Sequence, residues 1–269
     1  MNMRTALPRH RGIAFTFAAT VCGISLLTGC NAEAGGTRGP GWVPVPVASG
    51  TATPGPVSMP DIKATAPEVP ADKAFDPAKA LAAAGETPYA ANVKTTTEVN
   101  GVPSATMSGR ANLNGPFTGR VKMKSGKSTT EVVMTDDANY IRFTDTAGAA
   151  WTRTPRTDNG FPTSYEGYAK LLLDAGPSAR RGMEEQGGIA TYRLSGYLSL
   201  TQIASVDPRN HASMKTKGIA GFDIDQWIDS RGRTIRFEQR FELRGVKAAN
   251  KGTFSDFGPA EKFTAPTSG

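Results

Sequence analysis

The sequence is poor in cysteine and histidine, and it contains only one long apolar run. Its two cysteines, Cys22 and Cys30, exclude a disulfide scaffold, and the single run excludes a multi-span membrane protein. The two histidines, His10 and His211, leave little for nucleophilic catalysis. Hydrophobic residues at 38% argue against a fully disordered chain, whereas 30 glycines and 19 prolines indicate that part of the 269 residues is non-globular.

The N-terminal segment has the pattern of an export signal. Residues 1–11 contain Arg4, Arg9 and Arg11 and no acidic residue, and residues 12–27 are apolar or small throughout. An apolar stretch of about 16 residues after a basic start is too short for a comfortable membrane span and is typical of a signal sequence. We therefore expect residues 1–29 to form a signal peptide that is removed.

The apolar stretch ends in Leu27, Thr28, Gly29 and Cys30, a pattern that resembles the bacterial lipobox. In that motif a leucine and two small residues precede the cysteine that receives a diacylglyceryl group. The alternative is an ordinary secretory signal that happens to contain Cys30, and the agreement of position, apolar run and motif favours the lipobox. We expect the lipidated Cys30 to anchor the chain at the extracytoplasmic face of the cell membrane, since each buried methylene of an acyl chain such as palmitate contributes about 0.8 kcal/mol.

Residues 30–71 consist of that cysteine and a segment rich in proline, glycine and alanine. Such a composition cannot bury enough apolar surface to offset its ordering entropy, so we expect a tether. Prolines favour polyproline II, which extends by about 3.1 Å per residue and holds a domain away from the membrane. The alternative is a low-complexity tract without a selected length. Loss of the three signal-peptide arginines lowers the net charge from +7 to +4, which gives no reason to expect nucleic-acid binding.

Residues 72–269 carry the alternating pattern of β-strands and form the one expected domain. Asn100 and Gly101 separate two alternating segments and are typical of a type I′ hairpin turn. Charged residues at nearly every second position in residues 222–243 indicate that one face of the sheet meets water. The expected strands lie near residues 93–99, 102–113, 117–124, 129–135, 140–144, 151–154, 190–200, 222–229 and 235–243.

Helix signals are fewer than strand signals. Asp76 is expected to cap a helix within residues 72–84, and Thr163 with Glu166 has the pattern of a capping box. Residues 178–187 are polar, and we expect a short helix or a loop there. Residues 207–218, which include the second histidine, are expected to form a loop.

The strand and helix patterns together predict an antiparallel α+β fold. About nine or more strands share one apolar face, and two or three helices have to cover that face. A two-residue turn at residues 230–231 is expected to place Asp225 beside Arg236 and Ile224 beside Phe237. That register keeps the apolar and polar faces of both strands consistent.

The segment from Trp227 to Arg236 resembles the tryptophan–aspartate–glycine–arginine hairpin of actinobacterial lipoproteins in the LolA-like/LppX-type group of lipoprotein carriers. Residues 253–258 are similar to the closing strand of that group, and residues 190–200 to the strand after its mid-domain helix. Thr234 stands where proline is common in the group, and Phe254 where tyrosine is. The resemblance covers roughly residues 87–266. It implies a strongly curved half-barrel with helices against its concave side, where some relatives bind acyl chains; others sense stress for membrane regulators.

The sequence contains no constellation that supports catalysis, so we expect neither an enzyme nor a cofactor. His211 is the single histidine after the signal peptide, and no G-x-S-x-G elbow occurs. Gly126, Lys127 and Ser128 resemble the end of a phosphate-binding loop, but Val121 stands where that motif requires glycine.

A metal site is not expected either. Asp223, Asp225 and Asp229 share one strand face, but strand neighbours two residues apart are about 6–7 Å from each other, which is wide for one ion. We expect this face to be solvated and ion-paired, with Arg236 forming an ion pair with one of the carboxylates.

The remaining candidate is the apolar concave face of the sheet, which is either the wall of a lipid cavity or a filled core closed by a helix at residues 168–173. We expect a membrane-anchored lipoprotein that binds a lipid or other apolar ligand without catalysis. The alternative is a protein-interaction or sensory module that binds an envelope protein through its charged convex face or exposed edges. The expected wall residues are Val121, Met123, Val132, Met134, Ile141, Phe143, Leu172, Ile224, Phe237 and Phe241.

The lipobox hypothesis makes a direct prediction. Radiolabelled palmitate is expected to enter the wild-type protein and not a Cys30→Ala variant, which should leave the pelleted envelope for the soluble fraction because it lacks the anchor. The matched control is Cys22→Ala, which changes a cysteine of the removed segment and should be labelled normally. A Cys30→Ala variant that pellets as firmly as the wild type would contradict the anchor.

Overall fold

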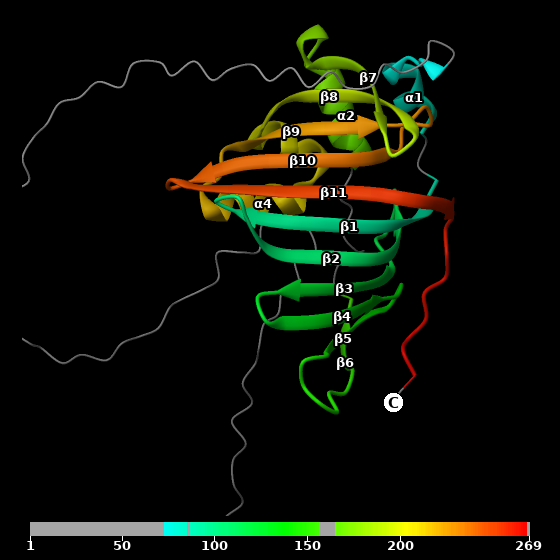
Figure 1. Cartoon of the computed structure of the whole chain (residues 1–269), viewed down its shortest axis with the longest axis vertical. Coiled ribbons are helices and arrows are strands. Elements are labelled where there is room, and N and C mark those ends of the chain that lie inside the picture. Colours follow the sequence, from blue (N-terminus) through cyan, green and yellow to red (C-terminus); the bar gives the residue numbers. More distant parts are fainter. Residues whose placement is uncertain (1–72, 85–86, 157–164, 268–269) are drawn as a thin grey trace, which may run out of the picture.

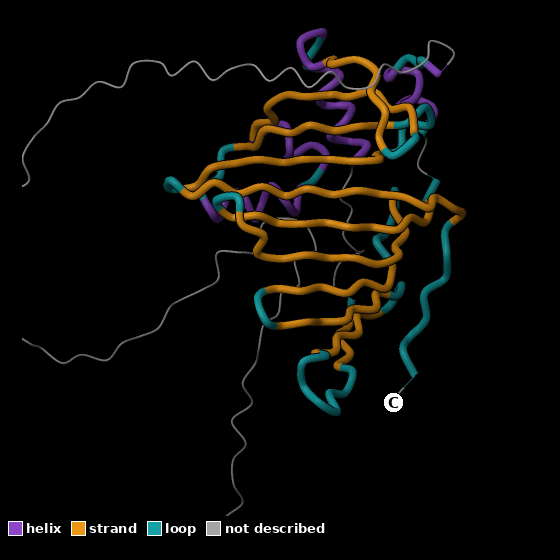
Figure 2. Tube along the Cα trace, in the orientation of Figure 1, coloured by secondary structure: helices purple, strands orange, loops and turns teal. Residues whose placement is uncertain are grey.

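The computed structural model describes residues 73–84, 87–156 and 165–267, most of which lie in strands (Figure 2). The strands are β1 (Tyr89–Val99), β2 (Val102–Leu113), β3 (Gly119–Ser125), β4 (Ser128–Met134), β5 (Ala138–Phe143), β6 (Thr152–Pro155), β7 (Arg180–Gln186), β8 (Ile189–Ser199), β9 (Gly221–Ile228), β10 (Thr234–Leu243) and β11 (Val246–Pro259). The helices are α1 (Pro77–Ala83), α2 (Tyr165–Asp174), α3 (Leu200–Val206), α4 (Pro208–Lys217) and the short 3₁₀ helix η2 (Pro177–Ala179).

The strands form one antiparallel sheet in the order β6-β5-β4-β3-β2-β1-β11-β10-β9-β8-β7. Successive strands pair within each half, and the two halves join in the middle, where the first strand, β1, pairs with the last, β11 (Figure 1). Strands β6 and β7 lie at the two edges, so the curved sheet is open and not a closed barrel. The predicted antiparallel α+β fold with a half-barrel sheet is confirmed.

The hairpin between β1 and β2 has the predicted turn. Asn100 and Gly101 have φ angles of 50° and 79°, which is the left-handed conformation that a type I′ turn requires at both central residues. Asparagine and glycine adopt this conformation at little cost, and its twist matches that of the paired strands.

The helices lie on one side of the β7–β11 half of the sheet (Figure 1). Asp76 caps α1 as predicted, because its carboxylate accepts a hydrogen bond of 2.7 Å from the backbone N–H of Ala78. Ser199 and Gln202 form a capping box at the start of α3. The capping box predicted at Thr163 lies outside the described residues.

Two segments differ from the expected secondary structure, and the described residues contain four α-helices in place of the two or three expected, because α3 was not expected and α4 was expected to be a loop. Residues 207–218 are not a loop, because Asp207 caps α4 and Gly218 ends it in the left-handed conformation, which places His211 in a helix. Residues 178–187 begin in the short 3₁₀ helix η2, but most of them form β7 (Arg180–Gln186) and not the expected short helix or loop. This strand pairs only with β8 at the sheet edge, where exposure of both faces removes the apolar alternation that marks an inner strand.

The predicted register between β9 and β10 is wrong by two residues, although the faces are correct. Asp225 lies opposite Glu238 and Ile224 opposite Gln239, and a bulge interrupts the pairing between Thr234 and Arg236. The physical reason is Asp229, whose carboxylate accepts hydrogen bonds from the backbone N–H groups of residues 231 and 233 and so stabilises a longer loop.

The apolar core is divided into two clusters. The first, which we call the β1–β5 cluster, lies on the strands of the first half, with Tyr165, Phe237 and Phe254 at its border. The second, the helix-covered cluster, lies between the helices and β8–β9. The β1–β5 cluster also contains Ala91, Val93, Met107, Ala111, Leu113, Phe117, Val121, Val132 and Met134. The helix-covered cluster contains Leu81, Tyr168, Ala169, Leu172, Leu194, Leu198, Ile203, Met214, Ile219, Phe222, Ile224 and Ile228.

The central strands depend on one close contact. A Cβ atom at Gly252 would lie 2.1 Å from a ring carbon of Phe237, which is fully buried. We expect Gly252→Ala to lower the free energy of unfolding by about 1–3 kcal/mol through overpacking, as measured by urea denaturation. The control is Gly258→Ala in the same strand, whose Cβ meets the flexible end of Arg110 at 3.3 Å. Equal unfolding midpoints for the two variants would contradict this account.

Candidate functional site

The predicted wall residues on β3, β4 and β5 lie side by side on the concave face. Val121 is opposite Val132 and Val132 opposite Ile141, so that the three side chains form one row across three strands. Val121 and Val132 are buried, and Ile141 is half-buried. Met123, Met134 and Phe143 lie on the same face, where Phe143 is 39% exposed.

The remaining wall residues lie elsewhere. Leu172 and Ile224 belong to the helix-covered cluster, and Phe241 packs against it. Helix α2 is in tight contact with the sheet there, since a Cβ atom at Gly196 would lie 3.2 Å from a methyl carbon of Leu172. Phe237 belongs to the β1–β5 cluster, where its ring centroid lies 4.9 Å from that of Tyr165. The structure therefore brings the predicted residues together in two groups and not in one.

A buried amide lies at the border of these groups. Gln226 is fully buried and pairs with Phe237 across the two strands. Its Nε2 donates hydrogen bonds of 2.7 Å to the backbone oxygen of Tyr165 and to the hydroxyl of Thr234. Because the Tyr165 oxygen can only accept, these bonds fix the orientation of the amide, and its Oε1 is left without a hydrogen-bond partner.

A buried carboxyl group lies next to the same helix start. Glu166 is 5% exposed, and the hydroxyl of Tyr89 donates to its Oε1 at 2.7 Å. Burial raises the pKa of Glu166 above its ordinary value of 4.5, and the hydrogen bond from Tyr89 and the charge of Lys170 offset only part of this rise. Burial and the neighbouring carboxylate also raise the pKa of Tyr89. This pair lies at the border of the β1–β5 cluster, against which Tyr89 packs.

The convex face of β8–β10 carries a network of ion pairs. Asp225 is buried and bound by Arg193, at 2.7 Å, and by Arg240. Burial alone would raise the pKa of Asp225, but hydrogen bonds from the two guanidinium groups hold that pKa below its ordinary value. The predicted ion-paired face is present, whereas Arg236, expected to answer one of the aspartates, pairs with Glu238.

Arg236 also covers the tryptophan of the hairpin motif. The guanidinium carbons of Arg236 and Arg193 lie 4.7 and 5.2 Å from the ring centroid of Trp227. The indole Nε1 donates to Glu184 at 2.7 Å. Trp227 is therefore buried and hydrogen-bonded on the convex side, where it stabilises the pairing of β7–β10 and takes no part in the concave apolar face.

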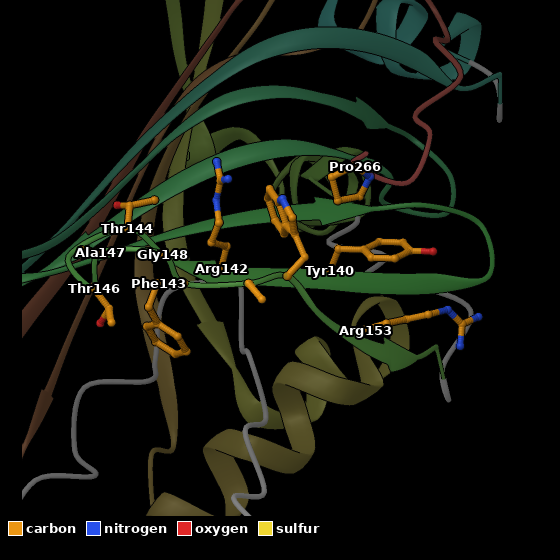
Figure 3. Close-up of a pocket in the computed structure, with 12 residues that line it drawn as sticks. Tyr140, Arg142, Phe143, Thr144, Thr146, Ala147, Gly148, Arg153 and Pro266 are labelled. Atoms are coloured by element: carbon orange, nitrogen blue, oxygen red, sulfur yellow. The ribbon is translucent and has the colours of Figure 1, made fainter. Parts of the chain in front are cut away.

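A cavity of about 580 Å³ lies at the other end of the sheet, around the loop between β5 and β6 (Figure 3). Among its lining residues, only Phe143 was predicted from the sequence. Arg142, Tyr140 and Arg153 follow a polar alternation on the convex side of β5 and β6, and a search for polar positions next to Phe143 would have found them. Pro266 comes from the C-terminal tail, 113 or more residues away from the rest, and no local pattern could place it there.

The described residues do not contain a group of three or more His, Cys, Asp or Glu side chains that could hold a metal ion. Asp223, Asp225 and Asp229 are thus not gathered into such a group. Gly126 and Lys127 form the turn between β3 and β4, which agrees with the rejection of a phosphate-binding loop. None of the helices within the described ranges is long and apolar enough to cross a membrane. The lipobox and Cys30 lie outside those ranges.

The raised pKa of Glu166 makes stability dependent on pH. The fold favours the protonated form of Glu166, because its pKa is higher in the folded than in the unfolded protein. This contribution to the free energy of unfolding is fully present below pH 4.5 and is lost as the pH rises through the raised pKa. For each pH unit between the unfolded-state and folded-state pKa values of Glu166, the free energy of unfolding falls by about 1.4 kcal/mol. We expect Glu166→Gln to remove that loss, so that urea unfolding shows an advantage of the variant that grows as the pH rises above 4.5 and levels off once the pH passes the raised pKa. Glu185→Gln, at an exposed position of β7, is the control. An advantage that does not change with pH would contradict the assignment.

Comparisons with known proteins give structural likenesses. No family model matches the chain, and no curated protein matches it. LprF from Mycobacterium bovis is 17% identical, with a TM-score of 0.44, and the match covers 70% of this chain and 93% of LprF. The lipoprotein LppX from Mycobacterium tuberculosis is 16% identical, with a TM-score of 0.37 and coverage of 72% and 98%. A LolA superfamily protein from Nitrosomonas europaea is 9% identical, with a TM-score of 0.23 and coverage of 70% and 95%.

Proposed function

We propose that this protein is a lipid-anchored extracytoplasmic lipoprotein that binds an apolar ligand on the concave face of β3–β5 and performs no catalysis. The observation that carries the proposal is the row of Val121, Val132 and Ile141 across three strands, continued by Met123 and Phe143. A face of this kind, wide and lined by adaptable side chains, suits an acyl chain.

The position of the helices supports this face as the ligand site. Within the described ranges, the helices pack against β8 and one another, and they lie behind the β7–β11 half (Figure 1). Among the residues that the structure describes, Tyr165, the first residue of α2, is the one helical member of the β1–β5 cluster. The apolar face of β3–β5 therefore has no described helix packed over it, in contrast to the tightly packed helix-covered cluster.

The energetics of binding follow from the composition of the face. Each methylene that leaves water contributes about 0.8 kcal/mol, so a chain of about ten methylenes gains several kcal/mol after the cost of its ordering. The face contains methionine, valine and isoleucine side chains, which form no directional hydrogen bonds and therefore do not require polar groups on the ligand. Affinity is expected to rise with chain length because it depends on buried area.

The second candidate function is a protein-interaction or sensory module. It is supported by the close packing of Leu172 against Gly196, at which an added Cβ atom would lie 3.2 Å from a Leu172 methyl carbon. The convex ion-pair network around Asp225 would then supply the contact surface for an envelope protein. The two functions differ in whether a lipid accompanies the protein.

Ligand binding can be tested with a charge placed on the concave face. Native mass spectrometry of the purified protein is expected to show a bound lipid, and displacement of a fluorescent fatty acid is expected to weaken at least tenfold in Met123→Glu, because the carboxylate must be desolvated. The control is Lys124→Glu, an exposed position on the opposite face of the same strand. An empty wild-type protein that binds no fluorescent fatty acid would support the interaction module instead.

A further inference from the structure

The convex side of β3 carries a row of cations. Arg120, Lys122 and Lys124 occupy every second position of this strand, and all three are exposed. Side chains two positions apart on one strand lie about 6–7 Å from each other, so the three charges form a line along the strand. Lys127, which is exposed in the turn between β3 and β4, extends this line at one end of the sheet.

A further lysine lies beside this row. Lys94 of β1 is exposed and opposite Ser108 of β2, which is in turn opposite Lys122. Two strand spacings place the backbones of Lys94 and Lys122 about 10 Å apart, and between them β2 presents the short hydroxyl side chains of Thr106 and Ser108. The charged area is therefore two strands wide and not a single line. We call its five cations the basic strip: Lys94, Arg120, Lys122, Lys124 and Lys127.

The positive charge of the basic strip is not compensated by acidic side chains. Among the residues that the structure describes, none of the five cations forms an ion pair. The nearby carboxylates already have other partners, since Glu131 pairs with Arg142 at 2.6 Å and Glu98 with Lys251 at 2.9 Å. The convex face of β8–β10 differs from the strip, because its arginines and carboxylates bind one another.

The curvature of the sheet makes the basic strip accessible to a flat surface. A curved sheet resembles the outside of a cylinder on its convex side, and a plane touches a cylinder along a line parallel to its strands. Strand β3 lies along such a line in the β1–β5 half of the sheet, whereas the helices lie behind the other half (Figure 1). A planar partner can thus contact the whole row of cations at once.

We propose that the basic strip docks on a membrane surface rich in anionic phospholipids. Four of its five cations are lysines, and lysine is a compact point charge that suits a fluid layer of phosphate groups better than the bidentate recognition of one group. Each lysine close to an anionic membrane strengthens binding about fivefold. The width of the strip favours a surface over a linear polyanion, which a single row would bind equally well.

This inference rests on the membrane location in the proposed function and adds an orientation to it. A lipid anchor keeps the domain near the membrane, so that even weak electrostatic attraction is enough for docking. With the convex side of β3 on the lipid headgroups, the concave face of β3–β5 points away from the membrane. The apolar ligand would then be exchanged on the side of the sheet that faces the envelope.

The docking can be tested by the protection of lysines from acetylation in the full-length protein. The purified protein is mixed with vesicles of pure phosphatidylcholine or with vesicles that contain about 40% phosphatidylglycerol, and the acetylation of each lysine is followed by mass spectrometry. At about 50 mM salt, we expect Lys94, Lys122 and Lys124 to react at least threefold more slowly with the anionic vesicles. This difference should disappear at about 500 mM salt, because the charges are then screened. Lys79 of α1 and Lys215 of α4, both exposed, are internal controls that should react equally with both vesicles.

Charge reversal provides a second test. A variant with Lys122→Glu and Lys124→Glu is expected to lose the protection of Lys94 and Lys127, because the centre of the strip then repels the membrane. The matched control carries Lys79→Glu and Lys215→Glu, which change the net charge by the same amount at exposed positions outside the strip, and it should retain the protection. The comparison of the two vesicles with the wild type needs no variant and stays decisive if a variant fails to fold.

The possible outcomes separate this inference from its alternatives. Equal acetylation of the strip lysines with both vesicles would overturn it, and so would equal protection of Lys79 and Lys215. Protection by soluble polyphosphate but not by anionic vesicles would also overturn it and would assign the strip to a linear polyanion. The vesicles are added in solution, so the measurement does not require the anchor. Absence of palmitate labelling therefore contradicts the anchor, whereas normal labelling without lysine protection contradicts the docking.

Discussion

The pairing of β1 with β11 holds the two halves of this sheet together. These strands are separated by almost the whole domain, yet they pair along most of their length, with Val93 opposite Phe254. The same junction brings Phe237 and Phe254 to Tyr165 at the start of α2, and Gly252 leaves the space that the Phe237 ring fills. Because this contact is non-local, its loop-closure entropy has to be overcome before either half gains from the other.

The junction also separates two halves that differ in packing. On one side, the helices bury Leu172 and Tyr168 against β8 and β9, which leaves a filled core. On the other side, β3–β5 carry their apolar row without a described helix over it, and their convex side ends in the cavity of the β5–β6 loop. One sheet thus combines a helix-covered half with a half whose apolar face is the surface proposed for a ligand.

Much of the fold could be predicted because strand alternation and turn chemistry are local. The alternation identified every strand except β7 and β11 near its observed position, and Asn100-Gly101 identified the hairpin turn. Edge strand β7 was missed because exposure on both faces removes alternation, and α4 was missed although Asp207 and Gly218 mark its ends. Strand β11 was indicated only at its end, through the resemblance of residues 253–258 to a closing strand. The register of β9 and β10 depended on hydrogen bonds to Asp229, which a count of turn residues does not include.

The sequence by itself determined the lipobox hypothesis, most of the strands and the face on which their side chains lie, since all of these follow from neighbours within a few positions. Only the tertiary structure decided that the predicted wall residues divide into two groups, because this depends on where α2 packs. It also decided that Arg142, Trp151 and Pro266 share one cavity. Contacts between residues far apart in the chain form only when the whole sheet assembles. They depend on the balance of packing energy and loop-closure entropy over the whole domain, which no short segment reveals.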